Sequence, residues 1–539
     1  MRKPLDPEGP FFPLLPLLQY PGFQPHSEIL PKGHKRMPYN LPLPCDILFE
    51  QDFCVPMRDG IKLYCDVFRP PHVEKVPIIL VWAPYGKHGS SELFMNELPE
   101  RLGIPKSTYS GYENFEGPDP AYWVPKGYAI VNIDARGSWN SEGNMYYWGN
   151  NDSCDGYDAI EFLAKQPWCN GKVGMAGNSW YAISQWFIAS SQPPSLAAIA
   201  PWEGASDDCR DVGHRGGVPN PVMSHAVGML CPGRNLQEDQ GLMSVENEFW
   251  SSYWEDKRAK LGRIECPAYV LGSLRGWREI SSKNKWLRIH NEQEWRDWPF
   301  WQDDLASFFD FYLKDIKNDW PSTPPVRVSL LGISKPDIIN RPFPTYPPPS
   351  MSLRTHYLNA LTKAATTDLP TADSSVSYPA ADMKSEVTFD IIFTEYTELS
   401  GYAKLCLWMQ CHEHDDMDIF VILCKIDEDG KVLRHVNYQP DKVRREDLPL
   451  NNVDGKKELW HPHVKGEKIP KGDIVKVEFT TWPIGMIFEK GEKMRVRISG
   501  RDICLVETAE RKFLMPQNVG THILHTGRKF SSNIGLPVI

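Results

Sequence analysis

The stretch Gly174-Met-Ala-Gly-Asn-Ser-Trp-Tyr-Ala-Ile183 joins two different hydrophobic patterns in this 539-residue chain. Residues 173–176 have the β-branched and small side chains of a strand end, and residues 184–189 continue with the spacing of a helix. Ser179 therefore stands at a predicted strand-to-helix junction. Gly177 has no side chain to collide with the turned backbone. The stretch predicts a sharp turn that presents the Ser179 hydroxyl at the end of a sheet.

The helix predicted after Ser179 bears on the chemistry of that hydroxyl. Its free backbone N–H groups and its positive dipole end point toward the turn, where they stabilise negative charge on an oxygen. The N–H of Trp180 is then an oxyanion donor. The alternative is that Ser179 only caps the helix. We favour a nucleophile, because the Gly-x-Ser pattern coincides with a strand, a turn and a helix.

The segments around this turn indicate an α/β domain. The runs 76–84 and 128–134 are almost continuously apolar, which suits central strands of a sheet covered on both faces. Residues 155–166 have helical spacing, and strand-like segments return at 268–272 and 285–289, after a tryptophan-rich helical stretch. Alternating strands and helices predict a doubly wound sheet.

The chain changes character after Trp320. A proline-rich link is followed by short strand-like segments, such as 326–332 and 493–500, that Gly, Asp and Pro separate. This pattern predicts a β-sandwich domain of about 200 residues. We expect four parts: an arm rich in proline and aromatic residues at 1–45, an α/β domain at 46–202 and 266–320, a helical cap at 203–265, and a β-sandwich at 321–539.

The composition argues against several classes of protein. The chain is 41% hydrophobic and 24% charged, as in ordinary globular proteins, and its formal net charge of −10 opposes nucleic-acid binding. We expect no membrane span and no secretory signal, since the apolar runs are short. Twelve scattered cysteines without a Cys-x-x-Cys pair predict reduced thiols in a cytoplasmic protein. In the run 411–416 neighbouring side chains alternate in direction, so they cannot all bind one metal ion. We expect no metal and no organic cofactor, and no glycine-rich phosphate loop stands beside a suitable helix.

Several motifs stand in order along the chain; they are Met57–Leu63, Ala83–Lys87, Asp134–Gly143, the turn at Ser179, Glu398–Gly401 and Asp416–Val421. From about Asp46 to the C-terminus, this series resembles the X-prolyl dipeptidyl peptidase and cocaine-esterase-like hydrolases. The resemblance implies an α/β-hydrolase doubly wound sheet with a helical cap insertion, followed by an all-β jelly-roll domain.

The resemblance also implies roles for single residues. Ser179 matches the nucleophile, Tyr85 the tyrosine whose hydroxyl joins the oxyanion hole, and Trp180 the residue whose backbone N–H completes it. The alternative for Tyr85 is packing at the sheet edge with its hydroxyl bonded to backbone. We expect Asp134 and Arg136 to form a structural ion pair that holds their loop.

The partners that Ser179 needs are missing from their usual segments. In this fold the acid and then the histidine follow the serine along the chain. Residues 273–280 hold no aspartate, and Glu279 is their only carboxylate. At the turn where relatives carry histidine stands Arg296, which stays protonated and is no base. His290, directly after a strand, is the best candidate base, with a histidine bonded to backbone as an equal alternative.

Other polar residues are weaker candidates. His214 and His225 lie in the predicted cap, where nothing in their spacing requires a catalytic role. Asp207, Asp208 and Asp211 follow a predicted strand, and we interpret them as a solvated acidic loop.

Three functions remain open. The first is a serine hydrolase or acyl-transfer enzyme acting on an ester or amide of a hydrophobic small molecule, with Ser179, His290 and either Glu279 or Asp297. The second is a hydrolase-like enzyme with a degraded triad, whose pocket directs a non-hydrolytic cyclisation or isomerisation in small-molecule biosynthesis. The third is a non-catalytic binding protein. We expect a hydrophobic small-molecule partner, no nucleic acid and no membrane, and leave a homo-oligomer open.

Overall fold

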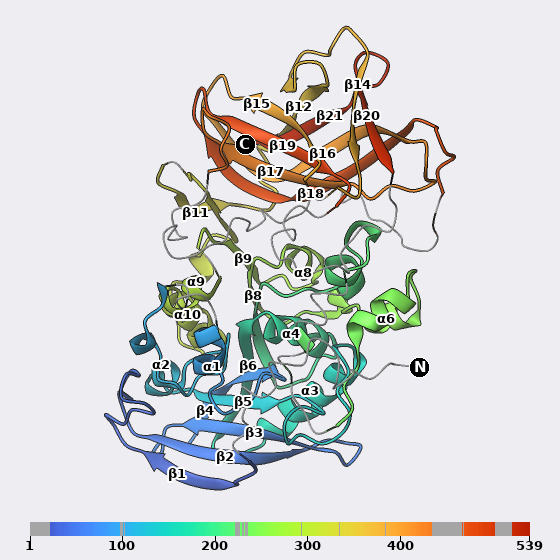
Figure 1. The fold of residues 1–539 in the computed structure, drawn as a ribbon. Coiled ribbons are helices and arrows are strands. Elements are labelled where there is room, and N and C mark those ends of the chain that lie inside the picture. The colour runs from blue at the N-terminus through green and yellow to red at the C-terminus, as the bar shows by residue number, and fades with distance from the viewer. Residues whose placement is uncertain are drawn as a thin grey trace. The chain divides into compact units, whose positions relative to one another are not determined.

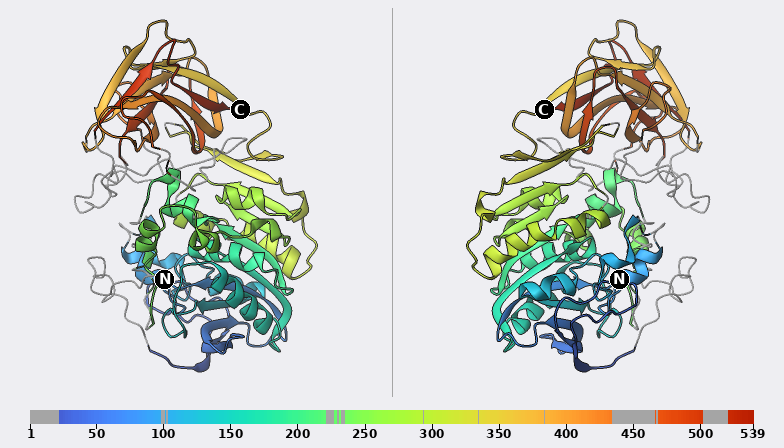
Figure 2. Two further views of the ribbon diagram at one scale, coloured as in Figure 1. Left: turned by 90° about the vertical axis from the view of Figure 1, so that its right-hand side faces the viewer. Right: turned by 90° about the vertical axis from the view of Figure 1, so that its left-hand side faces the viewer.

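A computed structural model describes residues 22–97, 101, 103–220, 227–228, 231, 235–292, 294–333, 335–382, 384–433, 466, 468–501 and 520–539. The chain divides into two compact units, Met1–Pro324 and Pro325–Ile539 (Figures 1 and 2). The first part of the predicted arm, residues 1–21, and His225 lie outside the described residues. The finer division into arm, core and cap stays a prediction.

A largely parallel sheet forms the centre of the first unit, with strands in the order β1-β2-β3-β5-β4-β6-β7-β8-β9. Their bounds are β1 (His26–Leu30), β2 (Ile47–Pro56), β3 (Lys62–Arg69), β4 (Val76–Ala83), β5 (Ala129–Asp134), β6 (Cys169–Asn178), β7 (Leu196–Trp202), β8 (Ala268–Leu271) and β9 (Lys285–Ile289). From β5 to β9 neighbouring strands are parallel, whereas β1, β2 and β3 join the sheet antiparallel.

The centre of this sheet is covered on both faces. Every residue of β4 and β5 is buried, as their continuous apolar runs predict. The prediction of a doubly wound α/β sheet is confirmed. Helices alternate with the strands (Figure 1); they are α1 (Ser91–Glu97), α2 (Pro120–Trp123), α3 (Asn150–Leu163), α4 (Trp180–Ser190), α6 (Gln240–Glu246), α7 (Ser252–Asp256), α8 (Leu274–Glu279), α9 (Glu294–Phe300) and α10 (Gln302–Leu313).

Short helical turns complete the first unit: η3 (Lys106–Thr108), η4 (Val124–Lys126), η5 (Cys209–Gly213), η6 (Arg215–Gly217), η7 (Leu261–Arg263) and η8 (Trp320–Ser322). In its described part, the predicted cap at 203–265 consists of such turns and the short helices α6 and α7. None of the helices in the part of the chain that the structure describes has the length and apolarity needed to cross a bilayer.

The helix α4 is the best-buried helix around the predicted turn. All its residues are buried, and it packs against β4, β6, β7 and α3. A helix without a solvent face is held from every side, so its first turn has a fixed position relative to the end of β6.

The second unit is all-β in its described residues, as predicted. Strands β10 (Val326–Leu330) and β11 (Ile338–Phe343) form a hairpin, and the larger sheet has the order β14-β20-β16-β21-β12-β13-β15-β19-β17, with β18 paired to β16. The bounds are β12 (Ser352–Asn359), β13 (Ala364–Thr366), β14 (Ser374–Pro379), β15 (Val387–Ile392), β16 (Thr397–Cys411), β17 (Phe420–Ile426), β18 (Val475–Phe488), β19 (Lys493–Ser499), β20 (Thr521–Thr526) and β21 (Asn533–Val538). Side chains such as Phe389, Leu405 and Val496 form its core.

Candidate active site

Ser179 lies at the turn between β6 and α4. Its φ of 56° and ψ of −118° are unfavourable for a residue with a side chain. The turn is held because the Ser179 N–H donates to the carbonyl of Trp202 at 3.0 Å. Among the described residues the hydroxyl makes no capping hydrogen bond, so the helix-cap alternative is wrong. Ser179 is half-buried, whereas its neighbours Asn178 and Trp180 are buried.

Gly177 permits this turn. Its φ is +135°, and a Cβ added there would lie 2.5 Å from the Cβ of Tyr181 in the first turn of α4. A side chain would therefore push the helix away from the strand end. The close approach keeps the backbone N–H groups at the start of α4 beside the Ser179 hydroxyl.

Tyr85 lies beside the same hydroxyl. Its OH is 3.5 Å from Ser179 Oγ, and its ring packs edge-on against Trp180 and Tyr181. Burial raises the pKa of the Tyr85 phenol well above its usual value, so the group stays protonated and can donate. The OH faces Ser179, unlike in the alternative of a tyrosine bonded to backbone. Tyr85, one of the two predicted oxyanion groups, thus lies beside Ser179 Oγ. Trp180, whose backbone N–H is the other, directly follows Ser179 as the first residue of α4.

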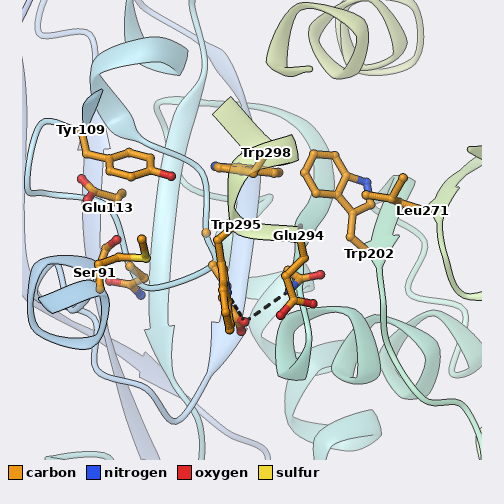
Figure 3. Close-up of a pocket in the computed structure, with 13 residues that line it drawn as sticks. Ser91, Tyr109, Glu113, Trp202, Leu271, Glu294, Trp295 and Trp298 are labelled. Carbon is orange, nitrogen blue, oxygen red and sulfur yellow. Dashed lines mark hydrogen bonds between the residues drawn. The ribbon is translucent and has the colours of Figure 1, made fainter. Parts of the chain in front are cut away.

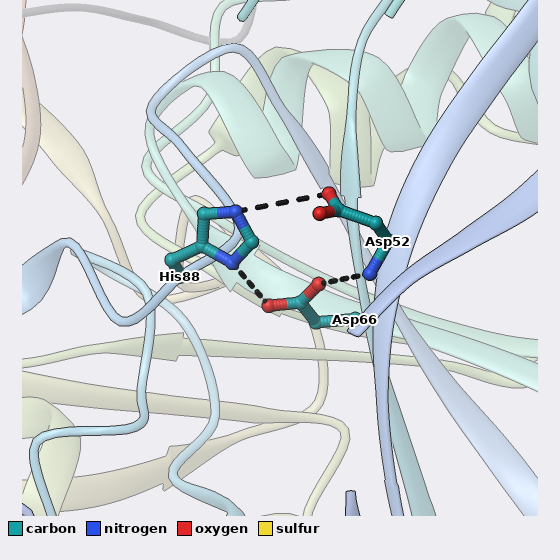
Figure 4. Close-up of side chains that lie close together, drawn as sticks. All are labelled: Asp52, Asp66 and His88. Atoms are coloured by element: carbon teal, nitrogen blue, oxygen red, sulfur yellow. Dashed lines mark hydrogen bonds and ion pairs between the residues drawn. The ribbon is translucent and has the colours of Figure 1, made fainter. Parts of the chain in front are cut away.

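A buried ion cluster anchors the loop that follows β4 (Figure 4). The Lys87 ammonium lies 2.6 Å from Asp52 Oδ1 and 3.3 Å from Asp134 Oδ2, and all three side chains are fully buried. His88 Nδ1 lies 2.7 Å from Asp66 Oδ2 and Nε2 lies 3.8 Å from Asp52 Oδ1. The ligand atoms of Asp52, Asp66 and His88 are close enough together to hold a metal ion. Because Lys87 already gives Asp52 a cation, we assign the cluster a structural role.

The predicted ion pair between Asp134 and Arg136 is wrong. Asp134 ends β5 and pairs with Lys87, whereas the Arg136 guanidinium reaches α3 and donates to Asp155 at 2.6 and 2.7 Å. Arg136 also pairs with Asp59 at 2.9 Å. Each residue still holds the loop, but through a partner that is distant in sequence.

The acidic loop after β7 is not solvated as predicted. Asp207 and Asp208 are 1% and 2% exposed. Asp207 pairs with Arg210 at 2.6 Å, and Asp208 accepts a hydrogen bond from Gln240. Burial raises the pKa of Asp208 to about 8. These carboxylates belong to the interior of the unit because short helical turns cover them.

His290 follows β9 and meets carboxylates instead of backbone. Its Nε2 contacts Glu203 Oε1, and its Nδ1 lies 3.7 Å from Asp297 Oδ1. Burial opposes the charged imidazole, but the Glu203 carboxylate raises the pKa of His290 above its usual value. In turn, although burial favours neutral Glu203, the charge of His290 lowers its pKa to about 2. The contact therefore favours an ion pair between protonated His290 and ionised Glu203.

The prediction of Glu279 as the orienting acid is wrong. Glu279 ends α8, is 34% exposed at its side chain, and pairs with Arg278 at 3.4 Å. Glu203 and Asp297 supply the carboxylates that face His290. Asp297, the alternative acid, thus lies beside His290, while Glu279 pairs with Arg278.

The remaining candidates lie apart from this chemistry or are not described. His214 packs edge-on against the ring of Trp254, and burial lowers its pKa to about 4. His225 and the side chain of Arg296 lie outside the described residues.

A pocket opens next to Asn178, the residue before the nucleophile position (Figure 3). Tryptophans and acids dominate its lining, which comprises Ser91, Met95, Tyr109, Glu113, Asn114, Glu116, Gly117, Asn178, Trp202, Leu271, Glu294, Trp295 and Trp298. Glu116 Oε1 accepts hydrogen bonds from Trp295 Nε1 at 2.9 Å and from Asn178 Nδ2 at 3.3 Å. The pocket therefore combines aromatic rings with directed polar groups, as small-molecule sites do.

Two family models match the chain. The model for the X-Pro dipeptidyl-peptidase (S15 family) matches residues 59–242, and that for the X-Pro dipeptidyl-peptidase C-terminal non-catalytic domain matches residues 318–534. The chain belongs to the X-Pro dipeptidyl peptidase and cocaine-esterase-like hydrolases. The predicted family is thus confirmed.

Relatives of known structure and sequence agree with this family. A CocE/NonD family hydrolase from Staphylococcus aureus superposes with a TM-score of 0.82 at 29% identity, over 92% of this chain and 94% of that one. An α-amino acid ester hydrolase shares the fold, with a TM-score of 0.65 at 16% identity over 92% and 97% of the two chains. The cocaine esterase of Rhodococcus sp. (strain MB1 Bresler) is 35% identical over 153 residues, which are 28% of this chain and 23% of that esterase. The match thus spans about a quarter of that curated relative.

Sequence reasoning missed three acids of this family member. Glu116, Glu203 and Glu294 lie near the turn, and Glu294 falls in the segment in which the sequence analysis expected a histidine. A carboxylate in that segment gives no sign of a catalytic role, because the fold leads one to expect an imidazole there. Nothing in the sequence around Glu116 or Glu203 predicted a place in the site, since neither lies in a motif. Each comes close to Ser179 only because the fold brings its loop there.

Proposed function

We propose that this protein is a serine hydrolase or acyl-transfer enzyme that acts on an ester or amide of a hydrophobic small molecule. The observation that carries the proposal is the position of Ser179 on its strained turn, with the Tyr85 hydroxyl 3.5 Å from its Oγ. Acyl transfer needs an oxygen nucleophile and donors for the charge that develops on the substrate carbonyl. Membership of a hydrolase family supports the same reaction.

In this proposal Ser179 Oγ attacks the acyl carbon of the substrate. The carbonyl oxygen gains negative charge, and the Trp180 N–H and the Tyr85 hydroxyl donate hydrogen bonds to it. The leaving alcohol or amine departs, and water or another acceptor then releases the acyl group from Ser179. The rings of Trp202, Trp295 and Trp298 in the adjacent pocket support an apolar or aromatic acyl group.

A non-hydrolytic cyclisation or isomerisation is the second candidate. The observation that favours it is the ion pair of His290 with Glu203, which occupies the imidazole that a triad would use. Such a reaction needs a pocket that holds one conformer and a few directed hydrogen bonds. It predicts that Ser179 is dispensable. A binding protein, the third possibility, predicts no turnover at all.

A cytoplasmic location forms part of the proposal. The eleven cysteines in the described ranges are free thiols, which suits a reducing compartment.

Replacing Tyr85 by phenylalanine is expected to lower kcat for p-nitrophenyl benzoate by about 10²-fold, with KM little changed. The variant keeps the ring and its edge-on contacts but loses the hydroxyl beside Ser179 Oγ. Release of p-nitrophenol measures the rate, and an unchanged melting temperature shows that the fold is intact. With the parent protein, p-nitrophenyl benzoate should be a better substrate than p-nitrophenyl acetate, because the rings of the pocket favour its aromatic acyl group. Equal turnover by the variant and the parent protein would argue against Tyr85 as an oxyanion donor.

A further inference from the structure

We infer that the carboxylate of Glu116, instead of an imidazole, removes the proton from Ser179 during catalysis. This inference rests on the proposed function, because it names the base of that reaction. Glu116 lies in the loop before α2, and its own backbone is tied to the turn: the Asn178 N–H donates to the Glu116 carbonyl at 3.1 Å. The loop and the nucleophile therefore move as one piece.

The hydrogen bonds of Glu116 fix one of its oxygens and leave the other open. Oε1 accepts from Trp295 Nε1 at 2.9 Å and from Asn178 Nδ2 at 3.3 Å (Figure 3). Oε2 is buried and has no donor of ordinary hydrogen-bond geometry within the described ranges. The Ser179 side chain interacts with this same carboxylate and favours its charged form. A serine hydroxyl can rotate about its C–O bond, so in this mechanism Ser179 turns its proton toward the Glu116 carboxylate.

The nearest alternative base is already engaged. Both ring nitrogens of His290 face carboxylates: Nε2 contacts Glu203, and Nδ1 lies 3.7 Å from Asp297 Oδ1. Although burial opposes it, the Glu203 carboxylate favours the protonated imidazole, whose nitrogens have no lone pair to offer Ser179. Removing that proton would leave the Glu203 carboxylate buried without its cation, which is costly. The pairing with Glu203 therefore gives His290 a structural role that does not require it to take part in proton transfer.

The surroundings of Glu116 suit a base at neutral pH. Burial raises the pKa of Glu116 to about 7. The ionisable groups that face it are Glu203 after β7, Glu294 at the start of α9, Tyr85 after β4 and Tyr181 in α4. Burial and the neighbouring Glu203 raise the pKa of Glu294 well above its usual value, which favours its neutral form. A base that titrates near the working pH combines the ionised form with adequate proton affinity.

The reaction can be written with this carboxylate. Glu116 takes the Oγ proton as Ser179 Oγ bonds to the acyl carbon and the carbonyl electron pair moves to oxygen. The intermediate collapses, the bond to the leaving oxygen or nitrogen breaks, and protonated Glu116 returns the proton to the leaving atom. Water then attacks the acyl group while Glu116 takes its proton. Collapse restores Ser179 Oγ, which receives that proton, so each cycle consumes one water and leaves Glu116 ionised.

The test compares Glu116→Gln with the parent protein by the rate at which an alkyl fluorophosphonate labels Ser179, from about pH 5 to 9. The parent rate should fall below about pH 7, as Glu116 becomes protonated. Glutamine keeps the shape of the side chain and an oxygen that accepts from Trp295 and Asn178, so the fold should persist. Since glutamine takes no proton, labelling should slow about 10²-fold or more. The rate should also no longer fall below about pH 7, which means that the acid limb of its pH profile is lost.

Two controls sharpen this test. Glu478→Gln changes an exposed carboxylate of β18 in the second unit and should label at the parent rate. His290→Asn should keep the acid limb, whatever its absolute rate, because the titrating base is still present. If the glutamine variant unfolds, Glu116→Asp replaces it in the test. Because its side chain is shorter but still ionisable, Ser179 should be labelled slowly in this variant, and the rate should still fall at acid pH.

The outcomes separate the two proposals. Parent-like labelling of Glu116→Gln with an unchanged pH profile, or loss of the acid limb in His290→Asn, overturns Glu116 as the base but leaves Ser179 as the nucleophile. Failure of the folded parent protein to label at Ser179 overturns the proposed function itself.

Discussion

Ser179→Ala is expected to reduce the turnover of a p-nitrophenyl ester by about 10³-fold or more. Covalent acyl transfer requires Oγ, and alanine has no atom that can replace it. The turn itself should survive, because the backbone N–H of residue 179 still donates to the Trp202 carbonyl and the helix α4 stays buried. The measurement is kcat under saturating ester, with circular dichroism to verify the fold.

A matched control for this variant is Ser281→Ala, which removes the hydroxyl of an exposed serine and should leave kcat unchanged. A small effect of Ser179→Ala would have a clear meaning. The pocket would then act on its ligand by shape alone, and the cyclisation or isomerisation hypothesis would replace hydrolysis.

Lys87→Met is expected to destabilise the first unit by about 3–5 kcal/mol. Methionine fills much of the same space but leaves Asp52 and Asp134 fully buried without the ammonium that now lies 2.6 and 3.3 Å from them. Guanidinium unfolding followed by circular dichroism measures the loss. Because Lys87 stands two residues after Tyr85, the variant should also lower esterase activity.

The pH dependence of that loss distinguishes charge from packing. Burial raises the pKa of Asp134 to about 6 even with Lys87 present. A carboxyl whose pKa is raised in the folded state stabilises the fold at low pH and loses that contribution as pH rises through its folded value. The penalty of Lys87→Met should therefore be smaller at low pH, and adding Asp52→Asn should recover part of it. A loss below about 1 kcal/mol at alkaline pH would show that the cluster is not essential.

The fold was predictable from the sequence because its signals are local. The unbroken apolar run at 76–84 became β4, buried at every position, and the glycine and serine of the 174–183 stretch fixed the turn through backbone geometry. The short strand-like segments after Trp320 became an all-β unit. In each case, the residues that carry the pattern are also those that form the element.

The partners of the site were not predictable in the same way. Arg136 was assigned to Asp134, two residues away, but its guanidinium reaches Asp155 in α3. Glu116 approaches Ser179 from a loop that precedes it by more than a complete strand and helix, so no spacing marks it. Side-chain pairing depends on which loops the sheet brings together, and that information is absent from any single stretch of sequence.

Covalent labelling followed by peptide mapping tests the central claim most directly. The folded protein is treated with an alkyl fluorophosphonate, and the modified residue is located by mass spectrometry. We predict modification at Ser179 in the folded protein and none after prior denaturation, because only the folded turn sets the hydroxyl beside Tyr85 and the N–H groups of α4. A folded protein whose Ser179 stays unmodified would contradict the assignment of this residue as the nucleophile.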